Sequence, residues 1–338
     1  MKYMSLFSGI GGFEIAIQNI FPNAVCVGFS EVDKHAIAVY KHHFPTHESM
    51  GSVTDITEKQ IKKIIQNNGG IDLIIGGFPC QNLSSLARCF KAANSDGLEG
   101  PKSSLFYTMI QIIQWIKKHN PVQLHLLAEN NASMSSTNKK LITDTFEGVF
   151  EIPIYCTDLN GIDFGVQKRR RLYWTTWTVA SEGIKCKQTW DDVLEPVEKC
   201  KHILSDKHIL GTCSKIYPKQ NKFPLLPVKA YDNTWIFEES KIENSISKWQ
   251  RGFNSDTRNQ NSNPITRNLN MANSLIDRRI GNDKFIIRYF EPIEVERLFW
   301  IPEGWVSRRC SKSRCFKLLG NTVIIKVIEH ILGYHNVK

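Results

Sequence analysis

The sequence predicts an α/β protein with a doubly wound, mostly parallel sheet and a second, smaller domain. Through the first half of the chain, short apolar runs that suit buried strands alternate with segments of helical periodicity. From about residue 179 to residue 262 this regularity gives way to Lys, Asn, Ser and Pro with isolated aromatic residues. We therefore expect residues 1–178 to form the main domain, residues 179–287 the irregular one, and residues 288–338 a segment that returns to the main domain.

The elements of the main domain follow from these patterns. Apolar runs predict strands at residues 4–7, 25–29, 71–75, 124–127 and 172–176. Apolar residues at helical spacing predict helices at residues 13–20, 34–44 and 104–119, and a closing helix at 324–332. Strands alternating with helices favour parallel pairing, because each crossover helix returns the chain to the same end of the sheet.

The positive charge is confined to the second half of the chain. The net charge is +10, yet residues 1–160 hold 13 Lys and Arg against 14 Asp and Glu, whereas residues 161–338 hold 30 against 19. A basic half joined to a neutral half favours a polyanionic partner, and nucleic acid is the first candidate. A basic surface that serves solubility is the alternative.

The cysteines and the apolar segments indicate a reducing, aqueous compartment. The chain has nine cysteines and no Cys-x-x-Cys pair, which disfavours a disulfide framework. Cys186, Cys200, His202 and Cys213 match no common zinc spacing, so no metal site is predicted. No apolar run is long enough to cross a bilayer, and we expect a cytoplasmic protein that does not contact membranes.

The segment Gly76-Gly77-Phe78-Pro79-Cys80-Gln81 is the first candidate for chemistry. It directly follows the apolar run of residues 71–75, so Cys80 lies where an open α/β sheet presents its ligands. Two glycines permit close backbone approach, and the proline stiffens the turn. This placement favours a nucleophilic thiol, although a free cysteine is more often a small buried apolar residue.

A glycine turn joins the first strand to the first helix. Phe7-Ser8-Gly9-Ile10-Gly11-Gly12 suits a nucleotide-like ligand, and its spacing differs from that of dinucleotide-binding turns, which disfavours a dehydrogenase. Glu31 ends the second strand, where a carboxylate accepts hydrogen bonds from ribose hydroxyls. Together they favour an adenosine-containing cofactor over a simple tight turn with a solvated carboxylate.

With these motifs the chain resembles the DNA (cytosine-5) methyltransferases. Further motifs of that family follow in order: Ala128-Glu129-Asn130, Gln167-Lys168-Arg169-Arg170-Arg171, a return segment at 288–305, and Gly320-Asn321-Thr322-Val323. The resemblance implies a class I methyltransferase fold of Rossmann-like type, S-adenosyl-L-methionine as cofactor with S-adenosyl-L-homocysteine as product, and double-stranded DNA as partner. It also implies that residues 179–287 recognise the target sequence.

The resemblance assigns roles to residues of this chain. The implied catalytic residues are Cys80, Glu129, Arg171 and, less directly, Arg169. The implied cofactor-binding residues are Phe7, Gly9, Ile10, Gly11, Gly12, Glu31, Val32, Ser52, Val53, Phe78, Pro79, Leu105, Asn321 and Thr322. The implied DNA-binding residues are Gln81, Ser84, Ser85, Arg88, Gln167, Arg251, Gly252 and Arg258.

Three positions depart from the family pattern. Ser52 stands after Gly51 at the end of the third strand, where the family usually has an Asp that binds the adenine amino group. Val32 replaces an aromatic residue that commonly stacks on adenine, and Asn131 stands where a Val is usual. The first two changes bear on cofactor affinity.

Two other functions remain open at this stage. One is a tRNA cytosine-5 methyltransferase, and the other is a catalytically silent DNA-binding relative. Absence of an added regulatory module favours a prokaryotic, phage or viral modification enzyme that acts as a monomer, with a cognate restriction endonuclease in a restriction-modification pair as a further expectation.

Overall fold

A computed structural model describes residues 1–79, 104–182, 184, 188–200 and 284–335, together with four short strands between residues 228 and 277. The chain divides into two compact units. Unit 1 comprises residues 1–160, 170–184 and 323–338, and unit 2 comprises residues 161–169 and 185–322. Of the predicted return segment, residues 288–322 therefore belong to unit 2 and the remainder to unit 1.

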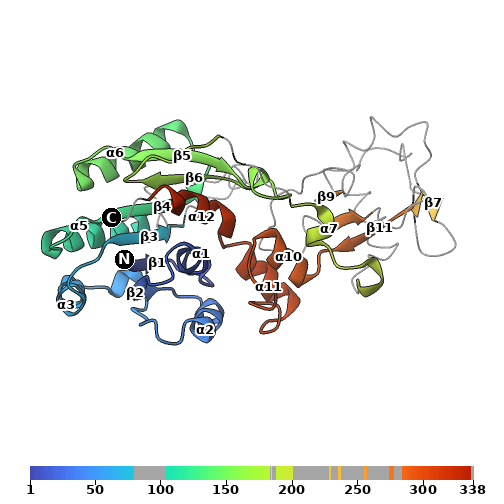
Figure 1. Cartoon of the computed structure of the whole chain (residues 1–338), viewed down its shortest axis with the longest axis horizontal. Coiled ribbons are helices and arrows are strands. Elements are labelled where there is room, and N and C mark those ends of the chain that lie inside the picture. Colours follow the sequence, from blue (N-terminus) through green and yellow to red (C-terminus); the bar gives the residue numbers. More distant parts are fainter. Residues whose placement is uncertain are drawn as a thin grey trace. The chain divides into compact units, whose positions relative to one another are not determined.

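Unit 1 is built on a six-stranded sheet with the order β2-β1-β3-β4-β6-β5 (Figure 1). The strands are β1 (Lys2–Leu6), β2 (Val25–Ser30), β3 (Leu73–Gly77), β4 (His125–Asn131), β5 (Tyr155–Asn160) and β6 (Arg170–Thr175). Strands β2, β1, β3 and β4 pair in parallel, whereas β6 is antiparallel to both β4 and β5. The predicted mostly parallel sheet is confirmed.

Helices cover both faces of this sheet. They are α1 (Gly12–Ile20), α2 (Lys34–His43), α3 (Glu58–Asn68), α5 (Ser104–His119), α6 (Ser136–Phe150) and α12 (Ile325–Gly333). Helix α12, from the C-terminal end, packs against α1, while α5 packs against α3 and α6 (Figure 1). The alternation along β1 agrees with this arrangement, since Met4 and Leu6 face the α3, α5 and α6 side.

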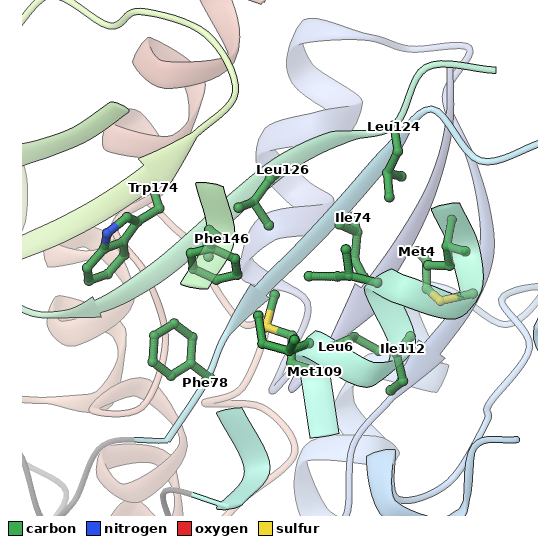
Figure 2. Close-up of a cluster of buried hydrophobic side chains, with 14 of the residues drawn as sticks. Met4, Leu6, Ile74, Phe78, Met109, Ile112, Leu124, Leu126, Phe146 and Trp174 are labelled. Carbon is green, nitrogen blue, oxygen red and sulfur yellow. The ribbon is translucent and has the colours of Figure 1, made fainter. Parts of the chain in front are cut away.

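The core on the α3, α5 and α6 side is a continuous apolar cluster. Figure 2 shows side chains from β1, β3, β4 and β6 packed against α5 and α6. Phe78 lies at its edge, with its ring centroid 5.1 Å from that of Phe106 and 6.1 Å from that of Trp174. Full burial of such side chains stabilises a fold by about 1.5–3 kcal/mol each. This packing fixes the end of β3, where the candidate nucleophile segment begins.

The third strand that the family pattern places before Gly51 is reduced to one bridge. Phe29 and Ser49 form an isolated parallel bridge, in which Phe29 donates its N–H to the Glu48 carbonyl and accepts from the Met50 N–H. A short 3-10 helix, Val53–Asp55, follows, and the Ser52 hydroxyl caps it. Residues 49–52 therefore still border β2, although they form no regular strand.

Unit 2 contains a small sheet and short helices. Its strands have the order β7-β8-β11-β10-β9, with bounds Val228–Lys229, Trp235–Ile236, Lys284–Tyr289, Ser274–Asp277 and Ser255–Asp256 in that order. Its helices are α7 (Trp190–Val193), α10 (Pro292–Leu298) and α11 (Lys312–Leu319), with 3-10 turns at Gly161–Asp163 and Val197–Lys199. Among the residues that the structure describes, no helix has the length and apolarity needed to span a membrane.

Candidate active site

Strand β3 carries the chain to the candidate nucleophile. It ends at Gly77, and the chain then continues through Phe78, which is buried, and Pro79, which is half-buried. Cys80 itself lies outside the described residues. The burial of Phe78 in the core anchors the backbone directly before the cysteine. Its side chain is thus part of the core, and any cofactor contact from this residue falls to its backbone.

Glu129 and Arg171 form an ion pair beside the end of β3. Arg171 Nε lies 3.0 Å from Glu129 Oε1, and the two side chains are 16% and 15% exposed. The register explains the contact, because Arg171 on β6 pairs with Asn131 and so lies diagonally across from Glu129 on β4. The pair therefore joins two predicted catalytic residues in a partly open position.

Gly77 makes room for the Glu129 carboxylate. The two residues are direct partners in the β3–β4 ladder. A Cβ atom at Gly77 would lie 2.9 Å from Glu129 Oε2, closer than real side chains tolerate. A side chain at residue 77 would therefore displace the carboxylate, and the glycine lets it lie against the strand that leads to Cys80.

Asn130 holds the backbone that precedes Cys80. Its side chain is buried, and Nδ2 donates to the Phe78 carbonyl oxygen over 3.3 Å while Oδ1 accepts from the Asn131 N–H over 2.6 Å. An amide is needed for this pair of contacts because one partner is an acceptor and the other a donor. The unusual Asn131 accepts from the Ser133 N–H over 3.1 Å, which shapes the turn after β4.

The glycine turn after β1 is a strained, compact loop. Phe7 has φ 56°, a left-handed conformation that is uncommon outside glycine, and Gly9 has φ 57°. The Ser8 N–H donates to the Ser30 carbonyl over 3.0 Å, which ties the loop to the end of β2. The loop thus holds its shape through contacts with the neighbouring strand.

Glu31 closes the same loop from β2. Its Oε2 accepts from the Gly9 N–H over 2.9 Å, and its Oε1 accepts from the N–H groups of Val32 and Asp33 over 2.7 and 2.8 Å. Three backbone donors therefore orient the carboxylate. Oε1 already accepts two of these bonds and Oε2 only one, so the remaining lone pair on Oε2 still permits a hydrogen bond from a ligand's hydroxyl group.

The turns at Gly9 and Gly51 border open space. A Cβ atom at Gly9 or Gly51 would meet no atom within 4 Å, so both turns border open space. Val32 is 71% exposed, which leaves an apolar surface next to Glu31. Ser52 accepts from the Thr54 N–H over 3.3 Å, and its hydroxyl lies 2.8 Å from Thr54 Oγ1. The turns at residues 7–12, 31–32 and 51–53, together called the cofactor edge, therefore suit the cofactor that the resemblance implies.

The remaining predicted cofactor residues occupy different positions. Ile10, Gly11, Gly12 and Val53 are buried, and Leu105 is partly buried against the core. Asn321 is exposed and Thr322 is buried, and both belong to unit 2.

Arg169 and Gln167 also belong to unit 2. The Arg169 guanidinium lies over the Phe299 ring, and its Nη2 donates to the carbonyl oxygens of Gly320 and Thr322 over 3.2 and 2.8 Å. Gln167 is 1% exposed, and neither side-chain polar atom has a hydrogen-bond partner among the described residues. Arg169 thus supports the backbone beside Asn321, whereas Arg171 pairs with Glu129.

A family comparison agrees with the motifs and their placement. The model of the C-5 cytosine-specific DNA methylase family matches residues 1–336. The chain belongs to the C-5 cytosine-specific DNA methylase family. The predicted family and enzyme class, DNA (cytosine-5-)-methyltransferase, are confirmed.

Individual relatives match to different extents. The type II methyltransferase M.HhaI of Haemophilus parahaemolyticus is 24% identical over 343 residues, covering 98% of this chain and 93% of the relative. The orphan methyltransferase M.SPRI of Bacillus phage SPR is 32% identical over 179 residues, covering 51% of this chain and 37% of the relative. Similarity to the phage enzyme thus spans about half of this chain.

Solved structures support the fold. The Entamoeba histolytica methyltransferase EhMeth matches with a TM-score of 0.70 and 15% identity, covering 99% of this chain and 97% of that chain. A DNMT2 mutant from Spodoptera frugiperda matches with a TM-score of 0.68 and 20% identity, covering 98% of both chains. The predicted class I methyltransferase fold is confirmed.

Several residues predicted for this methyltransferase lie outside the described part of the chain. They are Cys80, Gln81, Ser84, Ser85, Arg88, Arg251, Gly252 and Arg258. Three of the four cysteine and histidine residues considered for zinc, Cys186, His202 and Cys213, also lie outside it. The roles predicted for the eight residues remain predictions.

Two buried polar residues next to these loops were not predicted from the sequence. Ser30 donates its hydroxyl hydrogen to the Gly51 carbonyl over 2.6 Å and links two loops of the cofactor edge. Glu14 lies fully buried on α1 behind the glycine turn. A charged residue among apolar ones in the first turn of α1 was the available signal for Glu14, whereas nothing local distinguished Ser30.

Proposed function

We propose that this enzyme transfers a methyl group from S-adenosyl-L-methionine to carbon 5 of a cytosine in a specific short sequence of duplex DNA. The Glu129–Arg171 ion pair carries this proposal, because it lies beside the end of β3, where the chain leads to Cys80. A carboxylate and a guanidinium at that place match the two polar edges of a cytosine ring. We propose Cys80 as the nucleophile that makes the ring reactive.

The chain's own residues account for activation of the ring. The Cys80 thiolate adds to carbon 6, and a sulfur–carbon bond forms as the carbon 5–carbon 6 double bond opens. Glu129 shares a proton with ring N3 and so neutralises the negative charge that addition brings. Arg171 donates to the carbonyl oxygen at carbon 2. After methylation, loss of the carbon 5 proton and departure of the Cys80 thiolate restore the double bond.

The cofactor edge of unit 1 would hold the methyl donor. We assign the ribose hydroxyls to Glu31, one adenine face to Val32, and the adenine edge to the turn at Ser52 and Val53. The backbone of Phe7, Gly9 and Pro79 completes this edge. S-adenosyl-L-methionine, when bound, supplies an electrophilic methyl group that carbon 5 accepts.

Duplex DNA requires that the target base leave the stack, because carbon 5 and carbon 6 are not accessible within it. Extrusion costs a few kcal/mol, which contacts in the pocket and with the basic half of the chain offset. On the sequence alone, Gln81, Ser84, Ser85 and Arg88 follow the nucleophile and suit contacts with the displaced strand. Arg251 and Arg258 are the candidates for reading base edges.

Transfer of a labelled methyl group tests the proposal. Purified wild-type protein is incubated with S-adenosyl-L-methionine and either duplex DNA of mixed sequence or tRNA, and incorporation is measured for each. Cys80→Ala is the test variant, and Cys156→Ala is the matched control, because burial raises the pKa of that thiol to about 11 and leaves it inert. We expect labelled DNA, loss of labelling with Cys80→Ala and no change with Cys156→Ala.

Each other result identifies a different function. Labelling of tRNA without DNA would replace the proposal by the tRNA methyltransferase. Binding of the cofactor without a covalent complex on duplex DNA that contains 5-fluorocytosine would identify a silent relative. Bisulfite sequencing of plasmid DNA from expressing cells then gives the methylated sequence.

A further inference from the structure

Asn131 is the last residue of β4 and lies next to the Glu129–Arg171 pair. It follows Glu129 by two residues, so the two side chains project from the same face of the strand. In the β4–β6 ladder Asn131 is the direct partner of Arg171. Side chains that face each other in such a ladder have Cβ atoms about 4.5–5.5 Å apart. Asn131 therefore shares one patch of the sheet with the two residues that we assign to the cytosine ring.

On its other side Asn131 faces the segment that leads to the nucleophile. The β3–β4 ladder ends with Gly77 opposite Glu129. The chain beyond that pair stays close to β4, because a β4 side chain donates to the next carbonyl oxygen over 3.3 Å. The same register, continued by two residues, places Pro79 opposite Asn131, and Cys80 comes next in the chain. Asn131 thus lies between β6 and the segment that carries the nucleophile.

A hydrogen bond fixes the orientation of the Asn131 amide. Its Oδ1 accepts from the Ser133 N–H over 3.1 Å. Because a backbone N–H needs an acceptor, the amide oxygen faces the turn after β4 and the NH₂ group faces away from that turn. Asn131 Nδ2 donates to no residue in the part of the chain that the structure describes. The residue is half-buried, so its NH₂ group remains available to a ligand.

Arg171 also retains donors for a ligand. Its Nε contacts Glu129 at 3.0 Å, and its Nη1 donates to the Arg170 carbonyl oxygen over 2.8 Å. A guanidinium has five N–H groups, so the two on Nη2 remain. Two residues that are direct partners in the sheet therefore both present spare hydrogen-bond donors.

We propose that Asn131 is a further catalytic residue, whose Nδ2 donates to the carbonyl oxygen at carbon 2 of the target cytosine together with Arg171. This inference rests on the proposed function. A carbonyl oxygen has two lone pairs, so it accepts from both residues. Addition of the thiolate at carbon 6 increases the negative charge on this oxygen, and a second fixed donor stabilises that state.

The hydrogen-bonding edge of cytosine selects this contact for Asn131. The amino group at carbon 4 is a donor, whereas ring N3 and the oxygen at carbon 2 are acceptors. Glu129, an acceptor that shares a proton, matches the amino group and N3. An NH₂ group would oppose the amino hydrogens, so the oxygen at carbon 2 is the acceptor left for Asn131.

Combined substitution in the protein and in the DNA tests this contact. The substrate is a duplex with the sequence that bisulfite sequencing identifies, with either cytosine or 2-thiocytosine at the target position. The sulfur at carbon 2 is a poor hydrogen-bond acceptor. The kcat/KM for methyl transfer is measured on both duplexes for the wild type and for each variant, which completes a double-mutant cycle.

Two variants remove the donor in different ways. Asn131→Asp keeps an oxygen for the Ser133 N–H but lacks the NH₂ group, whereas Asn131→Ala introduces no charge. On cytosine each variant should lower kcat/KM by about tenfold, as expected for the loss of one hydrogen bond. On 2-thiocytosine each variant should equal the wild type, because the contact is already lost there.

Asn23→Asp makes the same chemical change far from the site and is the matched control. Asn23 is exposed in the turn between α1 and β2. Because β1, β2, β3 and β4 are parallel, that turn lies at the opposite edge of the sheet from the ends of β3 and β4. This control should reproduce the wild-type kcat/KM on both duplexes.

The other outcomes overturn the inference. Equal losses on cytosine and on 2-thiocytosine would mean that Asn131 does not contact the oxygen. Wild-type activity of Asn131→Asp with a loss for Asn131→Ala would assign the effect to the Ser133 contact, and a loss for Asn131→Asp alone would assign it to the added charge. A wild type that does not methylate duplex DNA contradicts the proposed function itself, and this measurement precedes every comparison of variants.

Discussion

Two arginine–glutamate ion pairs, one in each unit, differ in how many hydrogen-bond partners they have and in how far they are buried. In unit 2 the Arg288–Glu294 pair is 0% exposed, with contacts of 2.8 Å from Nη1 and Nη2 and further N–H donors to Glu294 from Glu195 and Glu291. In unit 1 the Glu129–Arg171 pair has one contact of 3.0 Å and remains partly exposed. The many hydrogen bonds of the buried Arg288–Glu294 pair favour a structural role. The partly exposed Glu129–Arg171 pair retains hydrogen-bond donors and an acceptor for a substrate.

Glu129→Gln gives the largest expected effect. The amide has nearly the same shape but cannot share a proton with ring N3, so kcat should fall by about 10²–10⁴-fold. The melting temperature should remain within a degree or two of the wild type, since one partly exposed contact is lost. Methyl transfer and thermal unfolding are measured together, with the exposed Asp144→Asn as control. A large fall in melting temperature without loss of kcat would instead assign the Glu129–Arg171 pair a structural role.

Arg288→Met should have the opposite profile. It leaves the buried Glu294 carboxylate without its cation, which costs about 3–5 kcal/mol in the free energy of unfolding. Urea denaturation measures this loss. The folded fraction should keep its wild-type kcat per active site, counted by titration with the covalent 5-fluorocytosine substrate.

A double variant sharpens the same prediction. Arg288→Met with Glu294→Gln removes both charges, while the Gln oxygen still accepts from one of the two backbone N–H groups, which bond to different carboxylate oxygens of Glu294. The double variant should therefore be more stable than Arg288→Met alone. If it is less stable, the unpaired charge is not the cause of the loss.

His335 provides a buried titratable group in unit 1 whose ring nitrogens have no hydrogen-bond partner among the described residues. Burial lowers the pKa of His335 to about 4, and neighbouring His125 also lowers it. The unfolded chain takes up a proton at about pH 6.5 and the folded chain does not, so stability is lost as the pH falls from about 6.5 toward 4. The loss should reach at most about 3 kcal/mol. Urea denaturation of the wild type and of His335→Phe measures it, and a variant with the same pH dependence contradicts the assignment.

An exposed pair provides the smallest expected effect. Arg170 contacts Asp158 through Nε and Nη2 over 2.8 and 2.6 Å, with the Arg170 side chain 68% exposed. Solvent screens this pair, so Arg170→Ala should change the free energy of unfolding by less than about 1 kcal/mol. Its kcat should equal the wild-type value, which distinguishes Arg170 from Arg171 one residue later. A loss of kcat comparable to that of Glu129→Gln would place Arg170 in the catalytic machinery.

Local patterns predicted the elements whose residues are apolar at regular spacing. The helix expected at residues 104–119 is α5 with the same bounds, and the four parallel strands and the closing helix are present. Helices α3 and α6 were not predicted. Thr57 and Gln60 form a capping box before α3 and Gly69 ends it, so start and stop signals were available there although the apolar pattern was weak.

Neighbouring arginines in one motif show what local patterns do not contain. Arg169 and Arg171 are two residues apart and would share a face in one strand. Strand β6 begins at Arg170, however, and Arg169 belongs to unit 2, where carbonyl oxygens of Gly320 and Thr322 bind it. Arg171 contacts Glu129, which lies more than 40 residues before it in the chain. Arg169 contacts Thr322 in the C-terminal segment. The partners of both arginines therefore come from distant segments.

The amino-acid sequence alone predicted the family and a mostly parallel sheet, and it marked Glu129 and Arg171 as candidates for catalysis, because motifs and periodicity are local properties of the chain. Tertiary packing placed β6 antiparallel between β4 and β5, and the register of that pairing brings Arg171 to Glu129. It also determined that Glu14 is fully buried on α1, where its carboxyl group accepts from the Tyr40 hydroxyl. Strand register and burial depend on partners distant in the chain, and their free energies arise only when those partners pack together.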